Sequence, residues 1–162
     1  MPISNRLVVA DTGSLIALAR IRRLDLLPAL FQQVLLTPTI LDECEARPDR
    51  GEGREIRAAL ASKHFQLLAP GAALPVLGID PGETSAIALA QELGAGVLMD
   101  DKAGRTVAKQ IGLAVIGTAG VLVLAKRRGL LPKVRPLLNA LVESGYFLGS
   151  NVVNEALRLS GE

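Results

Sequence analysis

Short apolar runs alternate with longer segments of helical periodicity along this chain. Four runs have the length of buried strands: LVVA at 7–10, VLL at 34–36, VLM at 97–99 and LAVI at 113–116. The segments SLIALARIRRLDLLPALF, PTILDECEA, TSAIALAQELG and AGRTVAKQIG carry helical spacing, and a helix-rich tail begins near Ala119. This alternation predicts an α/β fold in which a central parallel sheet lies between two helical layers, followed by a helical C-terminal tail.

The composition is that of one globular domain. The 162 residues contain 49% hydrophobic residues and no run of 18 apolar positions, and RPDRGEG at 47–53 is the one loop rich in Pro, Gly and charge. We therefore expect a single domain over residues 1–162 without a membrane span. The N-terminal stretch MPISNRLVVAD has no long apolar region typical of a secretory signal, so we expect a cytoplasmic protein. The single cysteine, Cys44, has no partner for a disulfide or a zinc motif and is expected to be buried.

Acidic residues follow the predicted strands at the points where functional groups gather in such sheets. Asp11 follows LVVA directly, and Asp100 and Asp101 follow VLM directly. Glu43 lies in the helix after VLL, and Glu83 lies in the first turn of a helix that begins near Asp80. If the first and fourth strands are neighbours, these carboxylates converge. Because several carboxylates cannot all be ionised in one pocket without a cation, the pattern predicts a divalent metal.

Each acid also has a structural interpretation. Asp80, Pro81 and Glu83 resemble a helix cap, and Glu43 is one of three acids on the polar side of a helix capped by Thr37. Either Asp100 or Asp101 can cap the next helix, but only one residue fills that position. Asp11 can be an N-cap, as can Thr12 or Ser14, so the individual assignments stay open at this point.

The chain resembles the PIN-domain family of metal-dependent nucleases, in particular the compact prokaryotic branch that includes VapC-type toxins. The resemblance is carried by VVADTGSLIALARI at 8–21, VLLTPTILDE at 34–43, the long stretch from Gly78 to Leu131, and PLLNALVESGYFLG at 136–149. The family acids match Asp11, Glu43, Glu83 and the pair Asp100 and Asp101, and counting back from Ala108 favours Asp101. Some relatives have an acid or hydroxyl after the next strand, where this chain has Thr118.

The resemblance implies a ribonuclease that hydrolyses RNA phosphodiester bonds with Mg²⁺ or Mn²⁺ and leaves 5′-phosphate and 3′-hydroxyl ends. Asp11, Glu43, Glu83, Asp100 and Asp101 would be its catalytic and metal-binding residues. It further implies a toxin with an antitoxin partner from an adjacent gene, and a homodimer. Apolar helix segments such as LIALARI and LLNALVES favour the same oligomeric state.

Three alternatives remain. The letters DTGS at 11–14 also occur in aspartic proteases, although this chain has no second DTG and helical periodicity follows Ser14. A catalytically silent PIN-like module that binds RNA or a partner is the principal alternative. A phosphatase-like use of Asp11 as a covalent nucleophile is less favoured, because Gly13 stands where a second aspartate is expected.

The basic residues are unevenly distributed, although the net charge is only +2. From Lys102 to Arg135 there are eight basic residues and no acidic one, and Lys102, Arg105 and Lys109 on the helix after the aspartate pair are candidate phosphate contacts. Thr12, Ser14 and Thr118 are candidates to bind substrate or to orient a water. The chain has four aromatic residues, none within the basic segment, so we do not expect base stacking to set specificity. His64 is expected to be a surface or packing residue.

Overall fold

The computed structural model describes residues 6–46, 51–72 and 78–162. At its centre lies a five-stranded sheet in the order β3-β2-β1-β4-β5, in which every pairing is parallel. The strands are β1 (Leu7–Ala10), β2 (Gln33–Leu36), β3 (Phe65–Leu67), β4 (Gly96–Leu98) and β5 (Val115–Ile116). In the registers of β1 with its two neighbours, Val9 pairs with Leu35 and with Val97. The predicted α/β fold with a central parallel sheet is confirmed.

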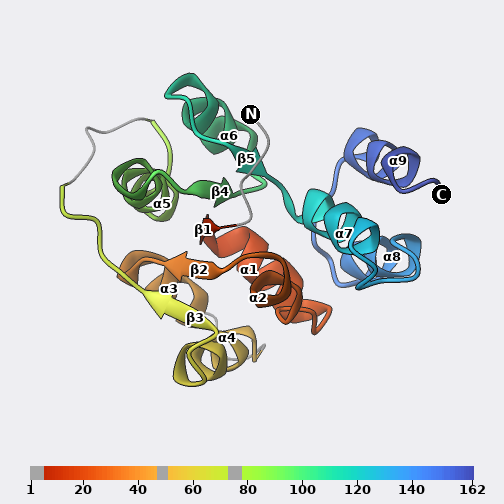
Figure 1. Cartoon of the computed structure of the whole chain (residues 1–162), viewed down its shortest axis with the longest axis horizontal. Coiled ribbons are helices and arrows are strands. Elements are labelled where there is room, and N and C mark those ends of the chain that lie inside the picture. Colours follow the sequence, from red (N-terminus) through yellow and green to blue (C-terminus); the bar gives the residue numbers. More distant parts are fainter. Residues whose placement is uncertain (1–5, 47–50, 73–77) are drawn as a thin grey trace.

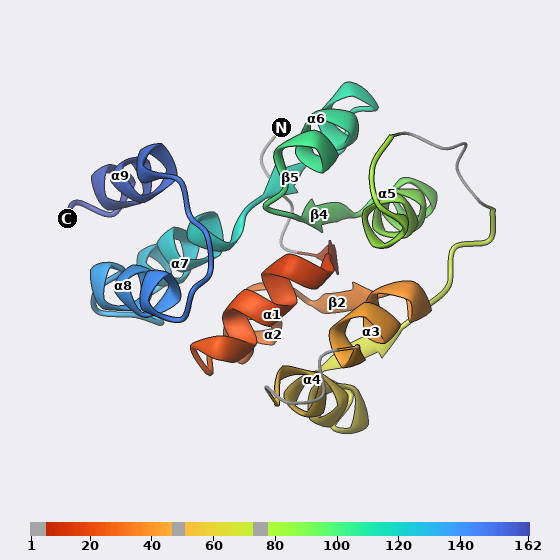
Figure 2. The same ribbon diagram turned by 180° about the vertical axis from the view of Figure 1, so that it is seen from behind.

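Helices surround this sheet. They are α1 (Thr12–Arg20), α2 (Leu26–Leu30), α3 (Pro38–Glu45), α4 (Glu52–Ala61), α5 (Pro81–Leu93), α6 (Lys102–Gln110), α7 (Thr118–Arg127), α8 (Arg135–Glu143) and α9 (Ser150–Leu159). Helices α1, α3 and α4 lie together in front of the sheet in Figure 2, and α7, α8 and α9 form a group at the end away from β3 (Figures 1 and 2). The helix-rich tail that the sequence predicts is therefore present.

The two central strands are apolar along their whole length because helices cover both faces of the sheet. Val8, Val9 and Ala10 of β1 are fully buried, as are Val97 and Leu98 of β4. Strand formation is favoured by the β-branched valines, and burial of these strands contributes to one continuous hydrophobic core.

The order of the strands decides where a site can form. From β1 the chain moves to β2 and β3 on one side, and then returns to β4 and β5 on the other side. This reversal places a topological switch point between β1 and β4, the place where open α/β sheets bind ligands. The amide of Asp11 donates to the carbonyl oxygen of Leu98 at 2.9 Å, so the residues that follow these two strands are held side by side.

The structure corrects several element predictions. Strand β3 is not predicted from the sequence pattern, because it is a three-residue edge strand in which two of three side chains are exposed. The long helical segment after Ser14 divides into α1 and α2, and the LAVI strand is reduced to Val115–Ile116. The predicted loop at 47–53 is wrong at Glu52 and Gly53, which begin α4; residues 47–50 lie outside the described residues.

Smaller expectations can also be compared with the structure. Cys44 is buried, as predicted, and His64 is exposed. The protease interpretation of DTGS is wrong, because Asp11 ends a parallel strand and Thr12 begins a helix of an α/β fold. Within the described ranges, no helix is both long and apolar enough to span a membrane.

Candidate functional site

Asp11 lies at the switch point between β1 and β4. It occupies the N-cap position of α1, but its side chain makes no capping hydrogen bond, and its Oδ1 atom is buried without a partner among the residues that the structure describes. Only 6% of the residue is exposed. Burial raises the pKa of Asp11 to about 8; the Thr12 amide opposes this rise, and the carboxylates of Glu83, Asp80 and Glu43 add to it. A buried, unpartnered carboxyl at this position is typical of a functional group.

Glu43 connects the beginnings of two helices to this position. Its Oε2 atom accepts a hydrogen bond from the Thr12 hydroxyl at 2.5 Å, and its Oε1 atom accepts one from the Gly82 amide at 3.1 Å. Thr37 caps α3 by accepting from the Ile40 amide, and Pro38 opens this helix, as the sequence predicts. Glu43 is therefore the acid of α3 that faces the site.

Glu83 is buried in the first turn of α5, with 5% of its surface exposed. The capping function belongs to Asp80, whose Oδ1 atom accepts from the Glu83 amide at 2.8 Å. Burial raises the pKa of Glu83 to about 7, and the negative charges of Asp80, Asp101 and Glu43 contribute. A Cβ atom on Gly104 would lie 3.2 Å from the Glu83 carboxyl carbon, so the Glu83 side chain lies against the start of α6.

The paired aspartates after β4 have different partners. Asp101 is exposed and caps α6 through a hydrogen bond of 3.0 Å from the Gly104 amide to its Oδ2 atom. The Oδ1 atom of Asp100 accepts from the Thr118 amide at 2.7 Å, and its Oδ2 atom accepts from the Thr118 hydroxyl at 2.6 Å. One aspartate thus starts a helix and leaves one oxygen free, while the other joins β4 to the beginning of α7.

Tyr146 is a site residue that the sequence analysis missed. Its hydroxyl donates a hydrogen bond to Asp100, and a Cβ atom on Gly13 would lie 3.6 Å from that hydroxyl. Burial and the charge of Asp100 raise the Tyr146 pKa far above its usual value, so the phenol stays protonated as a donor. No local sequence signal marks this contact, because Tyr146 is 46 positions from Asp100 and reaches it only through the packing of the C-terminal helices.

The three hydroxyl residues predicted to contact the substrate, Thr12, Ser14 and Thr118, differ in their hydrogen-bond partners. Thr12 and Thr118 are hydrogen-bonded to Glu43 and Asp100, respectively. Ser14 is fully buried in the first turn of α1, and its hydroxyl has no partner in the described part of the chain. The two unpartnered oxygens, on Ser14 and Asp11, both belong to the start of α1.

The basic segment separates into two groups in space. Lys102 begins α6 beside Asp101, Arg105 donates from Nη1 to the Met99 carbonyl oxygen at 2.8 Å, and Lys109 lies near the far end of α6. The other group stabilises the C-terminal helices: Lys126 contacts Glu162 at 3.0 Å, and the amides of Val134 and Arg135 donate to the same carboxylate. These contacts lower the pKa of Glu162 to about 2. Arg105 therefore lies beside Asp100, since a Cβ atom on Gly117 would lie about 3 Å from both side chains, and Lys102 follows Asp101 directly at the start of α6.

The donor set fits a hard divalent cation in its chemistry. All candidate ligands are carboxylate or hydroxyl oxygens, which Mg²⁺ and Mn²⁺ prefer, and the buried Oδ1 atom of Asp11 lacks a partner. As the side chains stand, no three His, Cys, Asp or Glu residues within the described ranges are arranged so that they could hold a metal ion together. A cation would therefore draw Glu43, Glu83 or an aspartate of the β4 pair toward Asp11.

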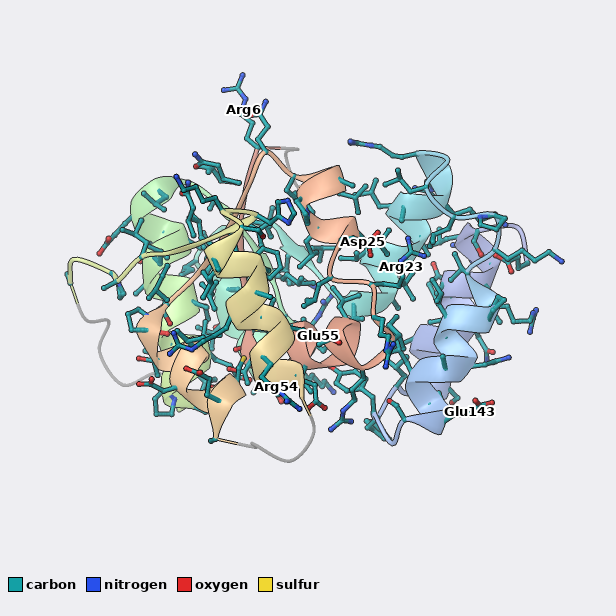
Figure 3. All side chains as sticks on the ribbon, turned by 90° about the horizontal axis from the view of Figure 1, so that it is seen from below. Arg6, Arg23, Asp25, Arg54, Glu55 and Glu143 are labelled. Atoms are coloured by element: carbon teal, nitrogen blue, oxygen red, sulfur yellow. The ribbon has the colours of Figure 1, made fainter. Side chains whose placement is uncertain are left out.

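A cavity of about 600 Å³ lies at the opposite end of α1. It is lined by Ala19, Arg20, Arg22, Gly51, Glu52, Arg54, Glu55 and Ser144, and Figure 3 labels Arg54 and Glu55 on its α4 side. The nine residues of α1 separate it from Asp11 by roughly 14 Å. Arg20 pairs with the buried Glu52 at 3.1 Å, and the lining contains three arginines and two glutamates, so this cavity is not an acidic cluster.

The glycine at position 82 leaves the space that Glu43 occupies. A Cβ atom there would lie 2.7 Å from the Glu43 carboxyl carbon, which is too close for any heavy atom. We expect Gly82→Ala to displace Glu43 from Thr12 and the Gly82 amide, and to lower any metal-dependent activity at least about tenfold, as changes beside metal ligands commonly do. Titration with Mn²⁺ and activity measurements check this, with Gly149→Ala, where the added atom meets open space, as the control. Equal effects of both variants would contradict the assignment.

Comparisons with known proteins agree with this fold. A family model described as PIN domain (DUF3368) matches residues 7–162. Among solved structures, a PilT N-terminus domain protein from the hyperthermophilic archaeon Sulfolobus solfataricus P2 superposes with a TM-score of 0.51 and 16% identity, over 78% of this chain and 95% of that chain. At this identity the likeness concerns the fold alone. No curated protein matches the chain.

Proposed function

Because the chain belongs to the PIN-domain family, a family with a nuclease-type fold, we propose that it is a metal-dependent ribonuclease. The observation that carries this proposal is the buried Asp11 carboxyl with an unpartnered oxygen, surrounded by Glu43 and Glu83 at the switch point of the sheet. Such a group is costly in a folded protein unless it binds something positive. RNA hydrolysis by a divalent cation is the chemistry that uses this arrangement.

Asp11, Glu43, Glu83 and Asp101 would hold Mg²⁺ or Mn²⁺. When bound, the cation lowers the pKa of a water ligand and neutralises charge on the phosphate. The residues of the chain position these groups: Thr12 and Gly82 orient Glu43, and Thr118 and Tyr146 orient Asp100. The free hydroxyl of Ser14 is available to orient a water or a ligand oxygen.

The proposed substrate is RNA, bound on the side of the site where α6 begins. Carboxylates repel phosphates, so the substrate needs positive side chains nearby, and the start of α6 supplies Lys102 and Arg105. Lys109 lies two turns further along α6 and would contact a more distant phosphate. Because its substrate is RNA, we also propose that the protein acts in the cytoplasm.

A silent binding module is the second candidate function. The observations that favour it are the hydrogen bonds that already occupy both oxygens of Asp100, and the lack of a ready three-ligand arrangement in the described part of the chain. Such a module would bind RNA or a partner protein at the same edge of the sheet without cutting. The two candidates differ in one measurable property, which is metal-dependent cleavage.

The test incubates the protein with a mixed RNA pool in Mg²⁺, Mn²⁺ or EDTA. We expect cleavage with either metal and none in EDTA. Asp101→Asn should greatly reduce cleavage while keeping α6 intact, because asparagine caps helices as well as aspartate does. Cutting that persists in EDTA contradicts the metal mechanism, and RNA binding without cutting in either metal favours the silent module.

The contribution of Lys102 can be measured from the salt dependence of RNA binding. In EDTA, Lys102→Ala should weaken binding at low salt and flatten the slope of log K against log salt by roughly 0.7–0.9, the value of one phosphate contact. Arg128→Ala, at the far end of α7, is the matched control and should leave the slope unchanged. Identical slopes for wild type and Lys102→Ala would remove α6 from the proposed RNA path.

We also propose two partners, a second copy of the chain and an antitoxin encoded by an adjacent gene. The apolar segments LIALARI and LLNALVES, on which the predicted dimer was based, lie mostly in the hydrophobic core, since Leu15, Leu18, Leu138 and Leu141 are buried. Val142, Val152 and Leu159 on α8 and α9 remain exposed and would supply the apolar part of a dimer contact. Light scattering at micromolar concentration tests the dimer, and inspection of the neighbouring reading frames tests the antitoxin.

A further inference from the structure

Two cavities adjoin each other along α4, at the end of α1 that lies away from Asp11. The first is the cavity of about 600 Å³ that Arg20 and Arg54 line, and the second has a volume of about 490 Å³. Arg22 and Glu55 line both cavities, so the two form one continuous groove. Each half has the size of a small-molecule pocket, and none of the acids at the switch point lines either half.

Part of the charge in this groove is already neutralised. Arg20 contacts the buried Glu52 at 3.1 Å, and Asp25, which precedes α2, contacts Arg23 at 3.0 Å (Figure 3). Among the residues that the structure describes, three charged lining residues take part in no ion pair: Arg22, Arg54 and Glu55.

Two guanidinium groups are therefore available to a ligand in the first half. A Cβ atom on Gly51, which lines this half, would lie 3.6 Å from the Nη2 atom of Arg54, so this guanidinium group lies at the start of α4. Planar guanidinium groups bind phosphate oxygens through paired N–H donors. The first half thus favours a phosphate group over a neutral one.

Arg22 is held at the junction of the two halves by the end of α1. Its amide donates to the Ala19 carbonyl oxygen at 3.0 Å, and the Arg23 amide donates to the Leu18 carbonyl oxygen at 2.9 Å, which is a Schellman motif. Arg22 has a φ of 56°, a left-handed conformation that glycine adopts with less strain. A glycine in its place would therefore keep the turn and remove only the guanidinium group.

The second half differs in chemistry from the first. Glu55 lies where the two halves meet, and a carboxylate there can accept hydrogen bonds from the hydroxyl groups of a ribose. From one end to the other, the groove offers groups for a phosphate, for a sugar and for the flat apolar face of a base. Most of the second half is apolar or aromatic, formed by Leu24, Pro28, Ala58, Ala59, His64 and Phe65.

We propose that this groove binds a nucleoside 5′-monophosphate, with the phosphate at Arg22 and Arg54, the ribose at Glu55 and the base in the apolar half. The site is distinct from the acidic edge of the sheet, from which the nine residues of α1 separate it by roughly 14 Å. It goes beyond the proposed ribonuclease function and does not depend on it, because it uses none of the residues that would hold the metal. A free nucleotide and the 5′-phosphorylated end of an RNA share this chemistry.

Titration calorimetry of the full chain with 5′-AMP in EDTA tests the site. We expect adenosine and inorganic phosphate each to bind at least about tenfold more weakly than 5′-AMP, because each lacks part of the contacts. Arg22→Gly should weaken 5′-AMP binding at least about tenfold, the usual effect of losing a charge-assisted hydrogen bond, and its melting temperature should be no lower than that of wild type.

Lys63→Gly is the matched control. Lys63 has a φ of 63° and the same position after α4, where its amide donates to the Leu60 carbonyl oxygen at 3.0 Å, but it lines neither half of the groove. It should leave 5′-AMP binding unchanged. Equal affinities of wild type and Arg22→Gly, equal losses in Arg22→Gly and Lys63→Gly, or no binding of 5′-AMP to wild type would overturn the inference.

Two further variants locate the ligand. Glu55→Ala should weaken binding of 5′-AMP but strengthen that of inorganic phosphate, because it removes a ribose contact and a negative charge; tighter binding of 5′-AMP by this variant would contradict the proposed orientation. Lys102→Ala should bind 5′-AMP as wild type does, and a loss of affinity there would place the nucleotide at the acidic edge and overturn the inference. A 5′-phosphorylated tetranucleotide that binds as tightly as 5′-AMP would identify an RNA end as the ligand, whereas much weaker binding would identify the free nucleotide.

Discussion

Replacing Asp11 by asparagine is expected to lower metal-dependent RNA cleavage by at least about a hundredfold while it stabilises the metal-free protein. The change keeps the shape of the side chain and removes its charge. Asp11 is nearly fully buried, its Oδ1 atom has no partner among the described residues, and the charges of Glu83, Asp80 and Glu43 act on its carboxyl group. Since even substitutions beside metal ligands commonly lower metal affinity or activity tenfold to a hundredfold, the loss of a central ligand should lower activity further.

The stability effect has the opposite sign because the native Asp11 destabilises the fold. With a pKa of about 8 in the folded chain against 3.8 for an ordinary aspartate in the unfolded chain, this carboxyl costs on the order of 4 kcal/mol at pH 7. A buried asparagine amide has its own desolvation cost, so we expect a net gain of roughly 1–3 kcal/mol. Thermal unfolding in EDTA should show a melting temperature raised by about 2–10 °C.

Asp42→Asn is the control for both measurements, because Asp42 lies on the same helix as Glu43 and is exposed. It should change neither cleavage nor melting temperature. If Asp11→Asn unfolds the protein, its loss of activity carries no information about metal, and isothermal titration with Mn²⁺ of Glu83→Gln then replaces it. A folded Asp11→Asn variant that cuts RNA like wild type would refute the assignment of this site.

The metal-free protein should lose stability as the pH rises from about 5 to 8. Carboxyl groups with a raised pKa bind a proton more tightly in the folded chain than in the unfolded chain. The folded state therefore holds more protons than the unfolded state between pH 4 and 8 for Asp11, and between pH 4.5 and 7 for Glu83. Stability falls through these ranges as the pH rises, and the loss is complete above the folded pKa.

At low pH the protein loses stability through the carboxyl groups whose pKa is lowered in the folded chain. The pKa of Glu162 falls to about 2 because the Val134 amide and Lys126 stabilise its charge, so its contribution is lost below about pH 4.5. We therefore expect the metal-free protein to be most stable near pH 5. Melting temperatures measured from pH 4 to 9 in EDTA check this.

Divalent metal should prevent the loss of stability that the metal-free protein shows above about pH 5. A cation bound by Asp11 and Glu83 favours their charged forms, so millimolar Mn²⁺ should raise the melting temperature at pH 8 and have little effect at pH 5. The variant Asp11→Asn should show a flatter profile in EDTA and a smaller response to Mn²⁺. A wild-type melting temperature in EDTA that is level from pH 5 to 8 would show that burial does not raise these pKa values.

The different partners of Asp100 and Asp101 bear on which of them would bind metal. Asp101 is exposed and uses its Oδ2 atom to cap α6, so its Oδ1 atom has no hydrogen-bond partner among the described residues. Asp100 has both oxygens engaged by Thr118, and Tyr146 donates to one of them as well. This geometry supports Asp101 as the ligand and Asp100 as the group that ties β5, α7 and the C-terminal helices to the site, in line with the spacing argument from Ala108.

The sequence by itself determined the fold class and the acidic edge of the sheet, because both follow from local patterns. Continuous apolar runs specify strands covered on both faces, and helical spacing between them specifies parallel connections. Parallel strands bring their carboxyl ends to one edge, so acids that directly follow β1 and β4 converge wherever these strands are neighbours. The caps at Thr37 and Asp80 could also be predicted, since a cap depends on residues within one helical turn.

Tertiary structure alone decided which of these acids are buried and what else reaches them. Whether Asp11 lacks a partner while Asp100 has several depends on side chains from four separate segments, and no spacing rule relates them. The short edge strand β3 forms only because β2 offers it a ladder, and its own residues carry no apolar run. Tyr146 reaches the site because a Schellman turn at Gly145 and the packing of α8 direct it there, and such long-range placement is a property of the assembled core.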